Sequence, residues 1–160
     1  MDEYFFPFQF NGNRAIVMGK KMYEGLIKKL KETIGEAAEL TLYLAGYNMG
    51  TKAYKKDEIM GGRDAQRLIS ISKAYFKAKG YGKLQVEKLD LDGKKATLKI
   101  YDSFECSLFK DSKKPQSQLI RGMLVGWYTG FFKEEMKVTE TRCIAKGDPY
   151  CQFEIQAKRE

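Results

Sequence analysis

The sequence predicts an α+β fold, in which an antiparallel β-sheet of four or more strands packs with about four helices and the last two strands form a hairpin. Three observations lead to this prediction. Apolar residues recur at helical spacing through roughly the first 80 residues, alternation with a period of two begins near residue 83, and one further helical stretch separates two strand pairs. With 160 residues and a hydrophobic fraction of 43%, we expect a single domain, 1–160, with its own core.

The N-terminal segment, residues 1–18, reads as an aromatic β-hairpin arm. Five aromatic residues lie between Tyr4 and Phe10, and Asn11-Gly12 is a strong hairpin-turn signal. So much apolar surface near a terminus has to be covered by something. Either the arm is a lid on the core of its own domain, or it makes a dimer contact.

Three helices are expected before the first long strand. Apolar residues repeat at helical spacing from Tyr23 to Ile34, and Gly35 ends the repeat. Residues 37–55 form a second helix that is apolar on more than one face, which predicts a central, well-buried helix. A third helix stops at Gly80.

The strands follow in two pairs. Lys83–Leu91 and Lys94–Phe104 flank Asp92-Gly93, which predicts a hairpin. After a polar loop and a helix over 117–132, a final hairpin is expected at about 134–144 and 149–156.

The helix over 117–132 carries glycines at four-residue spacing, Gly122, Gly126 and Gly130, and each interior glycine costs about 1 kcal/mol relative to alanine. Something therefore approaches this stripe closely. One interpretation is tight packing against a helix or the sheet. The other is room for a ligand beneath Trp127, in a mostly apolar cavity between this helix and the sheet. The candidate ligand-binding residues are Tyr47, Phe76, Phe104, Met123 and Trp127.

The end of the chain holds a candidate metal site. Glu140 and Cys143 are three residues apart, Cys151 follows, and the only other cysteine is Cys106. Three thiols and one carboxylate make the four-ligand set that tetrahedral zinc takes. A hairpin centred on Gly147 places residue 143 opposite residue 151, within reach of one metal ion. The spacing alone leaves two alternatives open: a cross-strand disulfide between Cys143 and Cys151, and cysteines that serve as small buried hydrophobes.

Strand geometry adds two expectations about these ligands. The separation of Glu140 and Cys143 has the wrong parity for a regular strand, so we expect a β-bulge that turns both to one side. Cys106 is in phase with Ala96, Leu98 and Ile100, so the inward row of another strand is expected to deliver it.

Composition excludes several classes of function. The chain has no histidine, which removes Ser-His and Cys-His catalytic pairs and every His-ligated metal site. It has neither a P-loop nor a strand-borne G-x-G-x-x-G motif. The formal charge of +8 is spread over many lysines, which argues against a nucleic-acid interface. No apolar run reaches the roughly 18 residues of a membrane span. An odd number of cysteines and no evident signal peptide indicate a cytoplasmic protein.

The C-terminal segment resembles a known family. Residues Glu140 to Ile155, which include Lys146-Gly147-Asp148-Pro149 between the two cysteines, are similar to the signature of the 4-vinyl-reductase domain family. The helix containing Gly122, Gly126 and Trp127 is similar as well, and so is the earlier Ala45-Gly46-Tyr47-x-x-Gly50. The similarity covers roughly residues 14–157 and is strongest after Cys106.

The resemblance implies a small-molecule-binding domain, which is shared with the sensor half of aromatic-responsive transcription activators and related to Golgi trafficking-complex subunits. In the sensors, Cys, Glu, Cys and Cys hold zinc, which matches Cys106, Glu140, Cys143 and Cys151. Four protein ligands leave no open position, so we expect a structural zinc rather than a catalytic one. Phenol-responsive relatives use a pocket histidine that is missing here.

Three functions therefore stand as hypotheses. The first is a sensor or carrier that binds a hydrophobic or aromatic small molecule and contains a zinc-tied hairpin. The second is a homodimeric assembly module, and the third is an enzyme or accessory in the reduction of a tetrapyrrole vinyl group. Binding fits the sequence better than catalysis. The excess of apolar residues in the first half also predicts a homodimer.

Overall fold

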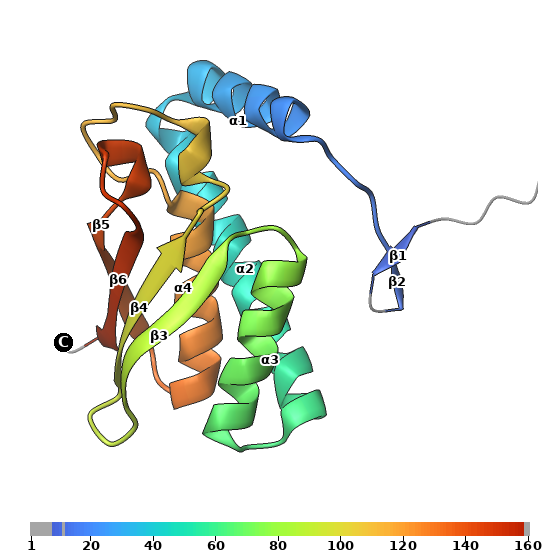
Figure 1. Ribbon diagram of the computed structural model, residues 1–160, viewed down its shortest axis with the longest axis vertical. Coiled ribbons are helices and arrows are strands. Elements are labelled where there is room, and N and C mark those ends of the chain that lie inside the picture. Colours follow the sequence, from blue (N-terminus) through green and yellow to red (C-terminus); the bar gives the residue numbers. More distant parts are fainter. Residues whose placement is uncertain (1–7, 11, 159–160) are drawn as a thin grey trace, which may run out of the picture. The chain divides into compact units, whose positions relative to one another are not determined.

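A computed structural model describes residues 8–10 and 12–158. The described residues fall into two compact units, which meet between Gly35 and Glu36. The elements are, in chain order, β1 (Gln9–Phe10), β2 (Asn13–Arg14), α1 (Lys20–Ile34), α2 (Glu36–Gly61), α3 (Ala65–Ala78), β3 (Lys83–Asp90), β4 (Lys95–Tyr101), α4 (Gln118–Phe132), β5 (Met136–Arg142) and β6 (Cys151–Ala157). Figure 1 shows them along the chain. Single 3-10 turns occur at Cys106–Leu108 and Ile144–Lys146.

The first unit contains a short hairpin and one helix. β1 and β2 pair antiparallel, with Phe10 opposite Asn13, which confirms the predicted turn around Gly12. Most of the aromatic arm, from Tyr4 to Pro7, lies outside the described residues, so its lid or dimer role stays a prediction. α1 ends as expected before Gly35, which has a positive φ of 56°.

The second unit begins with α2, which differs from the prediction. It extends to Gly61, and its buried residues form one narrow stripe at spacings of three and four: Ala38, Leu42, Gly46, Gly50, Tyr54, Asp57 and Gly61. Leu40 and Leu44 are 59% and 54% exposed. The expectation of a well-buried helix is therefore wrong, because apolar residues lie on several faces of α2 while only one face is covered.

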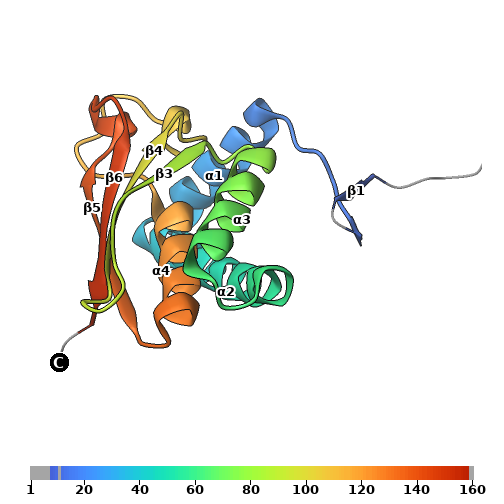
Figure 2. The ribbon, with the colours of Figure 1, turned by 60° about the horizontal axis from the view of Figure 1, so that its bottom comes forward.

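The sheet has four antiparallel strands in the order β3-β4-β6-β5, which confirms the predicted fold class. Figure 2 shows it nearly edge-on, with α3 and α4 on one side. Side chains alternate across the sheet, so Leu98, Ile100, Phe153 and Ile155 face the helices and are at most 2% exposed. Ile120 of α4 belongs to the same buried cluster.

The glycine stripe of α4 lies against α2, not over a space above the sheet. A Cβ at Gly122 or Gly126 would stand 2.0 or 2.2 Å from a backbone carbonyl oxygen of α2. Gly46 and Gly50 of α2 face α4 in the same way, with a Cβ at 2.1 Å from carbonyl oxygens of that helix. The helix-packing interpretation is therefore the one observed: two glycine stripes bring two backbones into contact.

Candidate metal centre

The four candidate ligands meet at one end of the sheet. The thiol sulfurs of Cys106, Cys143 and Cys151 and a carboxylate oxygen of Glu140 all lie within 4.8 Å of one another. The three cysteines are fully buried and Glu140 is half-buried. The chain segments that supply them are far apart in sequence, so folding assembles the cluster.

Sulfur distances distinguish a metal site from a disulfide. The Sγ of Cys106 is 3.5 Å from the Sγ of Cys143 and 3.5 Å from that of Cys151. Two thiolates on one tetrahedral zinc, each at about 2.3 Å, stand roughly 3.8 Å apart, whereas a disulfide bond is about 2.05 Å long. All three cysteines are free. The disulfide alternative is thus wrong for this structure, and the donor set fits a tetrahedral ion.

The C-terminal hairpin supplies three of the ligands in the predicted manner. The pairing of β5 with β6 shifts register between Glu140 and Arg142, which is the β-bulge expected from the parity of Glu140 and Cys143. The 3-10 turn Ile144–Lys146 then leads into Gly147, whose φ of 97° suits glycine. The carboxylate of Asp148 accepts a hydrogen bond from the Cys143 amide at 2.8 Å and so fixes the turn.

Cys106 arrives by a route that differs from the prediction. β4 ends at Tyr101, and Asp102 has a positive φ of 50°, so the chain turns away from the sheet before it reaches Cys106. The thiol lies instead on the 3-10 turn Cys106–Leu108. The inward row of β4 therefore stops short of the site, and a strand extrapolated beyond Tyr101 was the wrong assumption.

Ser117 is a member of the site that sequence reasoning missed. Its hydroxyl donates to Glu140 Oε1 at 2.7 Å and lies 2.9 Å from the Sγ of Cys106. The adjacent residue of Cys106, Glu105, is 4% exposed and accepts hydrogen bonds from the amides of Leu119 and Ile120 at 2.8 and 3.0 Å. The cluster is thus fastened to the first turn of α4 by two polar side chains.

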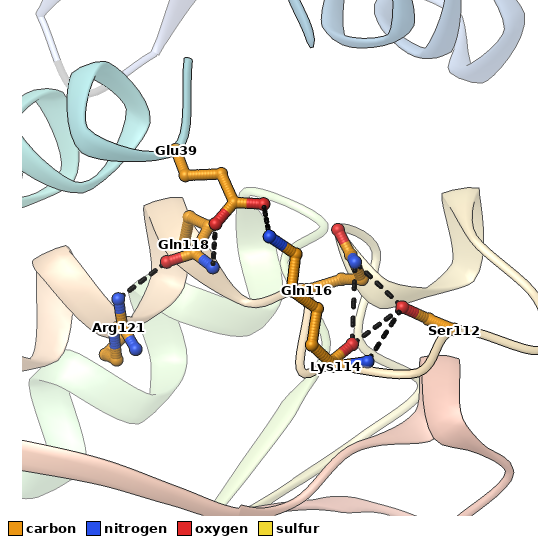
Figure 3. A network of polar contacts seen from close by, with 6 residues as sticks. All are labelled: Glu39, Ser112, Lys114, Gln116, Gln118 and Arg121. Carbon is orange, nitrogen blue, oxygen red and sulfur yellow. Dashed lines mark hydrogen bonds and ion pairs between the residues drawn. The ribbon is translucent and has the colours of Figure 1, made fainter. Parts of the chain in front are cut away.

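The loop before α4 is held by a polar network (Figure 3). The Lys114 ammonium lies 2.8 Å from the Glu39 carboxylate of α2, and the Gln118 side chain donates to the same carboxylate at 3.5 Å. The Gln116 amide donates to the Ser112 hydroxyl at 2.8 Å. Exposed ion pairs of this kind contribute little energy individually, but together they hold against α2 the loop that presents Ser117.

The electrostatics of the cluster call for a cation. Burial raises the pKa of Glu140 to about 8. Hydrogen bonds with the other two thiols raise the pKa of Cys106 and lower that of Cys143. Without a cation, four adjacent buried donors cannot all be ionised. A divalent ion supplies the missing positive charge and binds the deprotonated forms, so its binding should release protons.

The candidate ligand-binding residues do not share one clear site. Trp127 and Phe76 are buried, Phe104 and Met123 are half-buried, and Tyr47 is 37% exposed on α2. The Trp127 ring is surrounded by the rings of Tyr54, Tyr128 and Phe131, with centroids 4.9 to 5.6 Å away. Because the glycines that suggested a cavity face α2, the lining set stays a prediction.

Comparison with known proteins identifies the C-terminal part of the chain. The family model of the 4-vinyl-reductase domain matches residues 96–157. Two uncharacterized proteins of Methanocaldococcus jannaschii are also similar: MJ1642 is 34% identical over 37% of this chain and 37% of that protein, and MJ0745 is 29% identical over 82% and 62%. The chain thus spans less than two thirds of the length of these relatives.

Three solved structures share the fold. The phenol-responsive sensory domain of the transcription activator PoxR has a TM-score of 0.80 at 17% identity, covering 91% of this chain and 77% of that one. A vinyl-4-reductase family protein from Methanocaldococcus jannaschii has a TM-score of 0.60 at 19% identity, covering 92% and 85%. Trafficking protein particle complex subunit 3 from Naegleria fowleri has a TM-score of 0.61 at 17% identity, covering 88% and 93%.

Among the described helices, none has the length and apolarity to cross a membrane. The thiol cluster, the bulged hairpin and the helix-covered sheet all lie in or next to the matched segment. The resemblance seen in the sequence is confirmed: residues 96–157 of this chain are a 4-vinyl-reductase domain.

Proposed function

We propose that this protein is a sensor or carrier domain that binds a hydrophobic or aromatic small molecule and is stabilised by one structural zinc ion. The observation that carries the proposal is the set of four donor atoms within 4.8 Å of one another. The zinc ligands are Cys106, Glu140, Cys143 and Cys151. The small-molecule part is supported by the fold shared with the phenol-responsive PoxR sensory domain.

A structural role suits this donor set better than a catalytic one. Thiolates are soft ligands that zinc accepts readily, and four protein ligands complete its tetrahedral shell. Such a shell leaves no position for a water molecule or a substrate. The ion instead ties the 3-10 turn of Cys106 to the C-terminal hairpin, so its binding free energy adds to the free energy of folding.

Metal content tests the first half of the proposal. Native mass spectrometry and elemental analysis should find one zinc ion per chain. Glu140→Gln and Cys151→Ser should lower the affinity for zinc by at least about tenfold and reduce the melting temperature. Glu154→Gln, on the exposed side of the neighbouring strand β6, is the matched control and should change neither quantity. A protein that folds fully and holds no metal after purification in zinc-containing medium would refute the site.

Ligand binding tests the second half. Trp127 is the only tryptophan, so its fluorescence reports on the predicted pocket alone. Titration with p-cresol, toluene and palmitate should shift its emission in the presence of at least one of them, and native mass spectra should show the same adduct. If the emission ignores all three and no small molecule copurifies, the binding role fails while the zinc role is unaffected.

One observation favours the assembly module as a second candidate. α2 exposes Leu40 and Leu44, and the fold is shared with a trafficking-complex subunit. Large exposed apolar side chains grouped on one helix face commonly mark a partner surface. A stable complex with bound zinc but no small molecule would favour this role over the sensor.

A further inference from the structure

A second concave site lies at the opposite end of the sheet from the thiol cluster. It is a pocket of about 240 Å³ that is lined by Gly93, Lys95, Lys137, Gln156, Ala157 and Lys158. Along β4 and β6 the pair Ile100–Cys151 marks the thiol end and the pair Lys95–Gln156 marks the pocket end. Five residues of strand separate them, or roughly 17 Å, so the two sites share no residue.

Strand register places the polar lining residues in one row. Lys95 of β4 pairs with Gln156 of β6, and Gln156 pairs with Lys137 of β5. All three are exposed on the sheet surface that faces away from the helices, because their neighbours Ala96, Ile155 and Val138 are buried. Two ammonium groups therefore flank one amide on the same face, and Lys158 adds a third cation at the rim.

The acidic groups around this row already have partners. Glu134 pairs with Lys94, and Glu135 lies 3.3 Å from Lys158. Asp90 accepts the Gly93 amide at 2.8 Å within the β3–β4 turn. Within the described part of the chain, no acidic side chain forms an ion pair with Lys95 or Lys137, so positive charge gathers in a concavity without a protein counter-charge.

We propose that this pocket binds a small soluble anion that carries a phosphate group. Several like charges around a concavity repel one another and attract a compact anion. The lysine ammonium groups donate hydrogen bonds to phosphate oxygens as point charges, and the Gln156 amide between them provides further donors. The volume suits a phosphate or a pyrophosphate, whereas an extended nucleic acid would reach far beyond the row.

Calorimetric titration with pyrophosphate at constant ionic strength tests the proposal. The wild-type protein should bind pyrophosphate in a one-to-one ratio, and Lys95→Gln/Lys137→Gln should weaken binding by at least tenfold. The matched control is Lys73→Gln/Lys77→Gln on α3, which removes the same charge from two exposed lysines and should change the dissociation constant by less than twofold. Zinc content should be equal in all three proteins, which keeps this test independent of the thiol cluster.

Two outcomes would overturn the proposal. If the α3 variant weakens binding as much as the sheet variant, the effect is one of net charge and the pocket is not a site. If a single-stranded oligonucleotide binds with an affinity that rises with its length while pyrophosphate does not bind, the partner is a polyanion on the surface, not a small phosphate.

Discussion

Ser117 separates two tasks that residues at a helix N-terminus usually combine. It precedes α4, but its hydroxyl makes no hydrogen bond to a helix amide and is directed to Glu140 at 2.7 Å instead. Capping falls to Glu105, which accepts the amides of Leu119 and Ile120. A change at Ser117 should therefore affect the metal site with little effect on helix capping.

This division gives a prediction for Ser117→Ala. Without the hydroxyl, the Glu140 carboxylate loses the donor that orients it, and outer-shell partners of this kind are typically worth 10- to 100-fold in metal affinity. We expect zinc affinity to fall by about tenfold in competition with a chromophoric chelator. Ser112→Ala, in the same loop, should leave it unchanged. Equal affinity in Ser117→Ala and wild type would show that Glu140 needs no support.

Asp57 gives a prediction about pH. It is 4% exposed, and burial raises its pKa, although the Trp127 indole donates to it at 2.9 Å. A carboxyl whose pKa is higher in the folded state stabilises the protein most at low pH, and this stability is lost as pH rises above the unfolded value of about 4.

Asp57→Asn keeps an acceptor for the indole but cannot ionise. The variant should thus be more stable than wild type at pH 7, and the difference should shrink toward pH 4. Urea unfolding of metal-free protein at several pH values measures it. A stability difference that stays constant with pH would rule out ionisation of Asp57 as the cause.

The metal ligands could be predicted from residue types because three cysteines and a nearby glutamate permit few arrangements. Ser117 could not, because a serine before a helix is expected as an ordinary N-cap. The position of Cys106 depended on where β4 ends. That end is set by the positive φ of Asp102, and apolar periodicity carries no sign of it.

At the scale of elements, the contact between α2 and α4 depends on glycine. Gly126→Ala would place a Cβ 2.2 Å from the Tyr47 carbonyl oxygen, so the helices would have to separate, at a cost of about 3 kcal/mol. Gly25→Ala is the matched control, because Gly25 lies within α1 with no atom within 4 Å of its Cβ position.

The control should be neutral or stabilising by up to about 1 kcal/mol, since alanine favours a helix more than glycine does. Thermal and chemical unfolding of both variants measures the contrast. If Gly126→Ala is as stable as Gly25→Ala, the close backbone contact does not hold in solution.

The elements themselves were largely predictable, since helical and strand periods are distinct and glycines mark the ends. The partner of the glycine stripe was not inferred. Gly46 and Gly50 have the same four-residue spacing as the stripe of α4, and matching the two was the available signal. The β3–β4 turn shows a similar limit, since the positive φ falls on Lys94 while Gly93 makes room for the Asp90 carboxylate.

At the scale of the whole molecule, we expect a homodimer formed through the exposed face of α2. Leu40→Gln/Leu44→Gln should convert a dimer at tens of micromolar (roughly, well above common specific dissociation constants) into a folded monomer. Leu91→Gln, at an equally exposed position in the β3–β4 turn, is the control and should remain dimeric. Sedimentation velocity reports the state. A monomeric wild type would exclude this assembly, and deletion of residues 1–12 tests whether the arm contributes.

The glycine contact between α2 and α4 also has a mechanical consequence. Neither helix can rotate or slide by one residue along the other without driving a side chain into a carbonyl oxygen, so the pair moves as a single rigid lever. One end of that lever, at Leu119 and Ile120, is gripped by Glu105 beside a metal ligand. The other end, near Phe132, leads directly into β5. Any displacement of the thiol cluster must therefore reach the far end of α4 as one motion, without loss to sliding between the helices.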